Sequence, residues 1–267
     1  ASQSRTGDLS AWVLTSRADV NFSQGSPVDP ANVVLARQAI ALDPDYALAH
    51  AVLARSLAII SLNFEWPKFA EERPEVVGYR EEAVVEANLA ARLAPDDPKV
   101  LAFQAITLLW TGHPEEALPI IERVTRISPS YAEGLVYYAD ILTHNGRSRE
   151  AIPIFDKAIG LTPLAPQLGF FLFLRGEAFI HHGNFVDAEK NLLTARRVYQ
   201  IDTEVFLLYL AGAIMRLDKT DDARSLLQEA AGSKILSIAD EARKLAFYST
   251  DGGGEHFQSI WRDLENL

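Results

Sequence analysis

The chain has 267 residues, of which 48% are apolar, so it can bury a substantial core. Acidic residues outnumber basic ones by 36 to 25, a net charge of −11 that disfavours binding to nucleic-acid phosphates or to an anionic membrane surface. The sequence has no cysteine, which excludes disulfides, thiolate metal sites and cysteine nucleophiles. No apolar run approaches the roughly 18 residues needed to span a bilayer, so we expect no membrane contact by this region.

A 34-residue period organises the sequence. The segment GHPEEALPIIERVTRISP (112–129) aligns at this offset with GRSREAIPIFDKAIGLTP (146–163). Related segments lie at 80–95, 183–198 and 218–232. A period of this length is typical of stacked helix pairs, so we predict an all-α solenoid.

The predicted repeats form a single array over 1–267. In chain order they are 8–44, 45–95 with an insertion at 63–79, 96–129, 130–163, 164–200 and 201–234, with terminal helices or a cap over 235–267. Within the fourth repeat, we expect Gly146 to make the turn between the two helices and Ser148 to cap the second helix. Asp97 followed by Pro98 predicts an N-cap and the first residue of a helix in the third repeat.

Small residues recur at three positions of the repeat. The first helices carry Ala54, Ala105, Ala139, Gly176 and Ala211. The second helices carry Ala83, Ala117, Ala151, Ala188 and Ala223, and seven residues later Ala90, Val124, Ala158, Ala195 and Ala230. Two helices approach closely only where side chains are small, so these positions predict the contacts within and between helix pairs.

This pattern resembles the tetratricopeptide repeat (TPR) over nearly the whole chain. The fourth repeat shows it best: Leu135 and Ala139 lie in its first helix, and Ala151, Phe155, Ala158 and Pro163 lie in its second. The tryptophan of some TPR sequences is replaced by leucine. The resemblance implies a right-handed superhelix of about six to seven antiparallel helix pairs with a C-terminal capping helix.

Two segments depart from the period. The insertion at 63–79 is rich in aromatic residues, and Phe64, Trp66 and Phe69 either cover the end of a helix pair or form a lid over a groove. After a glycine run, apolar residues recur at helical spacing near the C-terminus, which predicts a terminal helix that covers the last repeat.

A narrower resemblance rests on AIALDPDYALAHAVLA (39–54), LTPLAPQLGFFLF (161–173) and, more loosely, HFQSIWRDLENL (256–267). These stretches are similar to bacterial TPR regions that follow class III adenylate or guanylate cyclase domains, or winged-helix and TolB-like regulatory domains. The resemblance implies the interaction module of a larger signalling protein. We expect it in the cytoplasm, or in the periplasm if the parent chain has an upstream transmembrane segment.

We find no pattern that indicates catalysis, a cofactor or a metal. His181 and His182 are adjacent, so on a helix they point about 100° apart and cannot bind one metal together. We expect His113 and His144 to be turn residues at the ends of first helices. The paired carboxylates fall in first turns of helices, where the helix dipole favours negative charge. The sequence therefore predicts a protein that is not an enzyme.

In TPR arrays the first helices line a groove, and the resemblance implies a partner-binding set on that face. The set is Arg55, Lys99, Ile106, Leu109, Glu133, Val136, Asp140, Phe173, Glu177 and Leu208. We expect the partner to be a protein or peptide segment that is apolar and carries basic residues, from another protein or another domain of the parent chain. Asp140 and Glu177 would orient that segment. Two alternatives are a small-ligand sensor with a pocket beneath the 63–79 insertion, and an enzyme.

Overall fold

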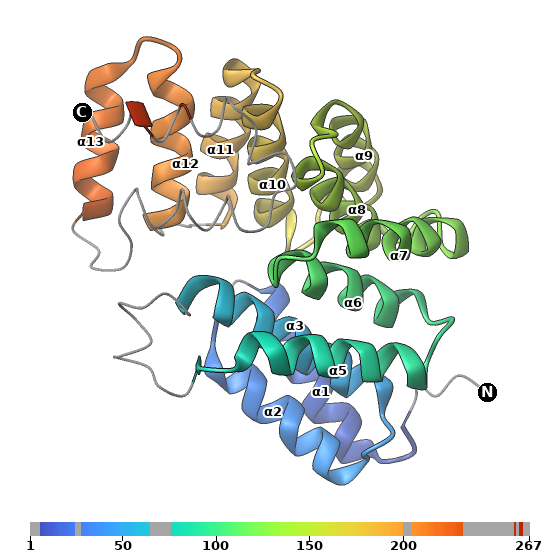
Figure 1. Ribbon diagram of the computed structural model, residues 1–267. Coiled ribbons are helices and arrows are strands. Elements are labelled where there is room, and N and C mark those ends of the chain that lie inside the picture. The colour runs from blue at the N-terminus through green and yellow to red at the C-terminus, as the bar shows by residue number, and fades with distance from the viewer. Residues whose placement is uncertain are drawn as a thin grey trace. The chain divides into compact units, whose positions relative to one another are not determined.

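The computed structural model describes residues 6–24, 28–64, 76–199, 204–231, 259 and 262–263; these residues form helices and turns without a strand. The described helices fall two to each predicted repeat from 8–44 to 201–234 (Figure 1). Their bounds are α1 Leu9–Ser23, α2 Pro30–Leu42, α3 Ala47–Phe64, α5 Tyr79–Leu93, α6 Pro98–Trp110, α7 Pro114–Ile127, α8 Ala132–His144, α9 Ser148–Leu161, α10 Leu168–His181, α11 Phe185–Tyr199, α12 Glu204–Met215 and α13 Thr220–Ala231. The all-α prediction is therefore confirmed.

The chain divides into two compact units, Ala1–Tyr137 and Tyr138–Leu267. In the first unit, α1 packs on α2, α3 on α5 and α6 on α7, and α3 also contacts α2 and α6. In the second unit, α10 packs on α11 and α12 on α13, while α9 contacts α10 and α11 contacts α12. Each unit is thus built from stacked helix pairs, and the single array over 1–267 stays a prediction.

The small residues of the period lie where helices meet. Every alanine of the three series whose side chain is described is fully buried, as is Val124. At Gly176 on α10, an added Cβ would lie 2.9 Å from Cδ2 of Leu192 on α11, closer than side-chain packing allows. The structure confirms that these positions are small because neighbouring helices approach closely there.

The turn inside the fourth repeat explains why glycine stands at 146. Gly146 has a φ of 73°, in the left-handed region that side chains with a Cβ rarely adopt. This conformation lets the N–H of Arg147 donate to the carbonyl of Leu142 at 2.8 Å, which closes the end of α8. Gly112 has a φ of 90° at the equivalent position one repeat earlier. The predicted role of Gly146 is confirmed.

One of the two predicted helix caps is wrong. Asp97 accepts hydrogen bonds from the backbone N–H groups of Lys99 and Val100 at 2.9 and 3.1 Å, as an N-cap does. Ser148, however, is the first residue of α9, and Arg147 is its N-cap residue. The turn is so tight that only Arg147 separates Gly146 from the helix, so Ser148 already has helical geometry.

Two predicted segments fall mainly outside the described residues. The insertion lacks a description from 65 to 75, which includes Trp66 and Phe69, and the cap is described only at 259 and 262–263. Arg216 at the end of α12 donates to the Ser259 hydroxyl at 2.5 Å and pairs with Asp263 at 2.7 Å. These contacts tie that part of the tail to the second unit, and the cap stays a prediction.

Candidate partner-binding groove

The ten predicted groove residues divide between the two units. Arg55 lies on α3, Lys99, Ile106 and Leu109 on α6, and Glu133 and Val136 on the part of α8 that belongs to the first unit. Asp140 on α8, Phe173 and Glu177 on α10, and Leu208 on α12 belong to the second unit. Each helix contributes residues to the same helical face in successive repeats, because the period places them at equivalent positions.

Most of these side chains are buried in the protein itself. Seven of the ten expose at most 3% of their surface: Arg55, Ile106, Leu109, Val136, Asp140, Glu177 and Leu208. Lys99, Glu133 and Phe173 are half-buried. A partner can reach the seven only if contacts within the chain are first broken, and their role in partner binding stays a prediction.

Arg55 is the centre of the network in the first unit. Its guanidinium carbon lies 3.7 Å from the ring centroid of Phe22 on α1 and 3.8 Å from that of Phe103 on α6. A cation between two aromatic faces is attracted by both rings, more strongly when water is absent. The side chain is fully buried, so these rings replace its hydration.

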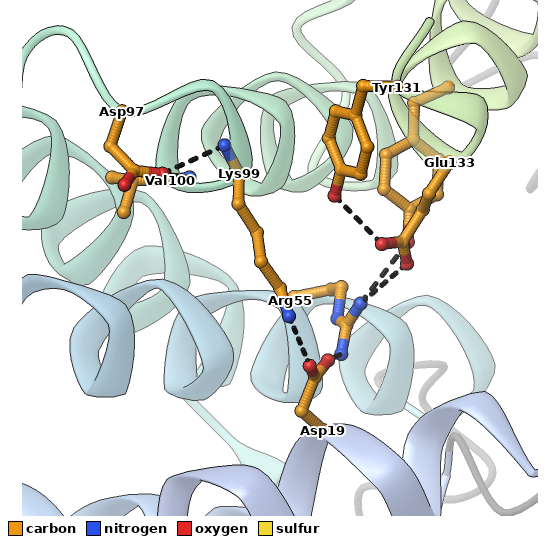
Figure 2. Close-up of polar contacts among 8 residues, drawn as sticks. Asp19, Arg55, Asp97, Lys99, Val100, Tyr131 and Glu133 are labelled. Carbon is orange, nitrogen blue, oxygen red and sulfur yellow. Dashed lines mark hydrogen bonds and ion pairs between the residues drawn. The ribbon is translucent and has the colours of Figure 1, made fainter. Parts of the chain in front are cut away.

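Carboxylates on two other helices neutralise Arg55 (Figure 2). The guanidinium donates to Asp19 on α1 at 2.6 Å and to Glu133 on α8 at 3.2 Å. Lys99 on α6 reaches the second oxygen of Asp19 at 2.5 Å. The two cations and two carboxylates thus join α1, α3, α6 and α8.

Two tyrosines complete the coordination of Glu133. The hydroxyl of Tyr131 donates to one carboxylate oxygen at 2.8 Å, and that of Tyr137 donates to the other at 3.0 Å. Burial, together with the Glu133 charge, raises the pKa of both tyrosines well above the ordinary value, so both remain protonated donors.

The electrostatics of the network keep its ion pairs charged. Burial acts against the carboxylate of Asp19, but Arg55 and Lys99 outweigh it, so the pKa of Asp19 is lowered. Burial also acts against the charge on Arg55, yet Tyr137, Asp19 and Glu133 hold its pKa above the ordinary value. Removing one member of such a network leaves a buried charge without its partner, so the ion pairs hold the helices in one arrangement. We interpret the network as structural and call the four residues Asp19, Arg55, Lys99 and Glu133 the clasp.

The predicted residues of the second unit also contact their own neighbours. Phe173 packs against the rings of Phe206 and Tyr209 on α12, with centroids 5.8 and 5.3 Å apart. Glu177 accepts a hydrogen bond from the Tyr209 hydroxyl at 3.0 Å. Asp140 lies 3.4 Å from the Nε2 atom of His144. These two acids are therefore engaged within the unit.

Sequence reasoning missed the contribution of α1. Arg55 directly follows the small residue Ala54, and Asp140 and Glu177 hold the same place after Ala139 and Gly176. The first repeat offers Ala18 and Asp19 in this place, so extending the alignment by one repeat would have found Asp19. Nothing in the period marks Phe22 as the second ring above Arg55.

A second surface on α1 was also missed. Leu9, Trp12, Val13 and Val20 are 73%, 53%, 40% and 47% exposed, and their spacing places them along one helical stripe. We call these four residues the α1 stripe. The signal was present in the sequence as apolar residues on a face of α1 that the repeat pattern does not use.

Comparisons with known proteins agree with the helix-pair architecture. Residues 104–166 match the family model described as a tetratricopeptide repeat. A search of the curated proteins gives no match to this sequence.

Solved structures support the same fold. A human IFIT1 dimer with m7Gppp-AAAA has 16% identity and a TM-score of 0.69, and the similarity covers 95% of this chain and 59% of that one. The chain thus spans about three fifths of the length of IFIT1. TTC0263, a thermophilic TPR protein from Thermus thermophilus, has 15% identity and a TM-score of 0.51, covering 83% of this chain and 98% of that one. The predicted TPR solenoid fold is confirmed, and at this identity the likeness extends to the fold alone.

Proposed function

We propose that this chain is a protein-interaction scaffold, the TPR module of a larger bacterial signalling or regulatory protein. TPR folds are used for binding rather than for catalysis, and the polar clusters on its predicted groove face are engaged in contacts between helices. The parent architecture rests on the resemblance of the 39–54 and 161–173 stretches.

The observation that carries the proposal is the α1 stripe. Four large apolar side chains are exposed along a helix whose opposite face is anchored by the buried residues Ala11, Ala18 and Phe22. Exposed apolar side chains that gather on one helical face are typical of a site of protein–protein contact. We therefore place the docking of an apolar partner segment on α1.

The partner class follows from charge. The chain carries a net charge of −11, which favours association with a segment that has basic residues beside its apolar ones. Of the predicted groove residues in the first unit, Lys99 and Glu133 are half-buried and so accessible enough to add contacts. Orientation by Asp140 and Glu177 would require breaking their contacts with His144 and Tyr209, so we assign them no partner contact.

The RNA in the IFIT1 structures does not extend to this chain. Neutralising phosphates requires clustered Lys and Arg side chains. Here Arg55 and Lys99 already pair with Asp19 and Glu133, and the second unit adds Asp140 and Glu177 on the equivalent helical face. The alternative of a ligand sensor depends on the insertion, whose residues 65–75 lie outside the described part, and it stays a prediction.

Localisation also remains part of the proposal. Among the described residues, no helix is both long and apolar enough to cross a membrane. We propose a cytoplasmic location on the basis of the resemblance to bacterial signalling proteins.

The test compares captured partners for variants of exposed residues. A photo-crosslinking amino acid at Ser16, which lies between the members of the α1 stripe, should capture a partner in cells of the source organism. Trp12→Ser with Val20→Ser should abolish this capture at unchanged stability, because exposed substitutions change stability by about 0.5 kcal/mol or less. Val186→Ser on α11, where Val186 is 64% exposed, is the matched control.

The captured peptide also has to fit the predicted class. Mass spectrometry should identify an apolar segment with Lys or Arg residues. Capture that persists in the Trp12→Ser, Val20→Ser variant would contradict the α1 stripe as the docking site. If partner capture is lost only in Phe173→Ala, the predicted groove is the docking site instead.

A further inference from the structure

The second unit holds a buried cluster of histidines and carboxylates that the proposed docking function does not use. Asp140 and His144 lie one helical turn apart on α8, and Glu177 and His181 lie one turn apart on α10. The Nε2 atom of His144 is 3.5 Å from Oε1 of Glu177, and the Nε2 atom of His181 is 3.9 Å from the same oxygen. Two acid–His pairs at i,i+4 spacing thus converge from neighbouring helices.

His144 ends α8, as expected, and His181 ends α10, but both side chains are buried. Adjacency rules out joint metal binding by His181 and His182. His144 and His181 are 37 positions apart in the sequence, yet their ring centroids lie 5.6 Å apart. The stacking of α10 beside α8 brings them together, which no local pattern reveals.

The three ligand atoms have the spacing of a metal site. Nε2 of His144, Nε2 of His181 and one carboxylate oxygen of Glu177 all lie within 4.8 Å of one another. Ligands about 2.0–2.1 Å from a tetrahedral Zn²⁺ ion are about 3.3–3.4 Å apart. The two distances to Glu177, 3.5 and 3.9 Å, therefore need only a small contraction around an ion.

The burial of the three side chains and the groups around them also favour metal binding. The side chains of His144, Glu177 and His181 are 2%, 4% and 2% exposed, so an ion would be shielded from water. The Tyr209 hydroxyl fixes the Glu177 carboxylate through a hydrogen bond of 3.0 Å, the type of outer contact that orients metal ligands. Asp140, 3.4 Å from Nε2 of His144, adds a second negative charge beside the site.

The protonation state of one histidine is compatible with metal binding. Burial, with the neighbouring His144, lowers the pKa of His181 to about 3. His181 is therefore neutral at ordinary pH, and neutral imidazole is the form that binds metals.

We propose that His144, Glu177 and His181 bind one divalent transition-metal ion of the Zn²⁺ type, which clamps α8 to α10. Two imidazoles and a carboxylate are a ligand set that such ions favour. The fourth position is open to water or to the Asp140 carboxylate. This site is separate from the docking surface on α1, and either proposal can fail without the other.

The test uses the full 267-residue chain without a histidine tag, stripped with a chelator and titrated with Zn²⁺ against a chromophoric competitor. We expect one ion per chain and a rise in Tm, because an ion that binds only the folded state stabilises it. Co²⁺ in place of Zn²⁺ should give the intense visible absorption of tetrahedral coordination. His144→Ala and His181→Ala should each weaken binding by more than the ~10–100-fold that loss of an outer-shell contact causes.

Two further variants make the result decisive. His182→Ala removes the exposed neighbour of His181 and should bind Zn²⁺ like the wild type. Glu177→Gln keeps the size of the side chain and its contact with Tyr209, so it reports on metal binding even if the alanine variants unfold; circular dichroism shows which variants are folded. Wild-type binding no tighter than that of Glu177→Gln, or an equal loss in His182→Ala, would overturn the proposal.

Discussion

Replacing Arg55 with methionine tests whether the clasp holds the first unit together. The substitution removes the charge that pairs with Asp19 and Glu133, while methionine retains apolar contact with Phe22 and Phe103. Breaking a buried ion pair by removing one partner costs about 3–5 kcal/mol. Here the two carboxylates are 17% and 18% exposed and Asp19 keeps Lys99, so we expect a loss of about 2–4 kcal/mol.

Urea unfolding followed by tryptophan fluorescence measures this loss. Three of the four tryptophans belong to the first unit, and Trp110 packs against Tyr137 and Phe22 beside Arg55. For a protein of this size the expected loss lowers Tm by roughly 2–4 °C per kcal/mol.

Arg37→Met is the matched control. Arg37 pairs with Glu82 at 2.8 Å, but the two side chains are 48% and 34% exposed, so its loss should cost at most about 1 kcal/mol. Equal stability of the Arg55 and Arg37 variants would refute the reasoning. If stranded carboxylates cause the loss, adding Asp19→Asn and Glu133→Gln to Arg55→Met should restore part of the stability; a further loss would show that the carboxylates stabilise the fold without Arg55.

Gly176→Ala should destabilise the second unit by about 1–3 kcal/mol in urea unfolding, because its Cβ would overlap Leu192. In Gly160→Ala on α9 the added Cβ meets nothing within 4 Å, so this variant should unfold with a free energy about 0.5–1 kcal/mol higher than the wild type. A change of the same sign in the unfolding free energy of both variants would contradict the packing argument. For pH, burial lowers the pKa of His50, but the hydrogen bonds to Glu86 and to the Pro44 carbonyl outweigh it, so the pKa is raised. The raised pKa means that protonated His50 contributes to the free energy of unfolding. This contribution is complete below the pKa of His50 in the unfolded chain, about 6.5, and is lost as pH rises through its higher pKa in the folded protein. Unfolding free energies from about pH 6 to 9 should therefore fall more steeply for the wild type than for His50→Gln, and parallel curves would refute the assignment.

The sequence alone determined the repeating architecture. Gly112, Gly146 and Gly183 make left-handed turns in successive repeats. The small residues from Ala54 to Ala223 recur from the second repeat to the sixth, because each helix pair requires close helix contact. Such local demands leave a periodic trace, so the helix pairs were predictable. The prediction that Ser148 caps α9 was wrong, because the exact start of a helix depends on how tightly the preceding turn closes.

Only the tertiary structure decided what the first helices do with their polar residues. The sequence marked Arg55, Asp140 and Glu177 as a face open to a partner, but whether that face is open depends on side chains from other repeats. Asp19 lies 36 positions before Arg55, and His144 lies 37 positions before His181. Long-range pairing of this kind follows from the stacking of whole helices and from burial, which forces charged groups to find partners. The period shows which residues share a face, and tertiary packing determines which of them meet.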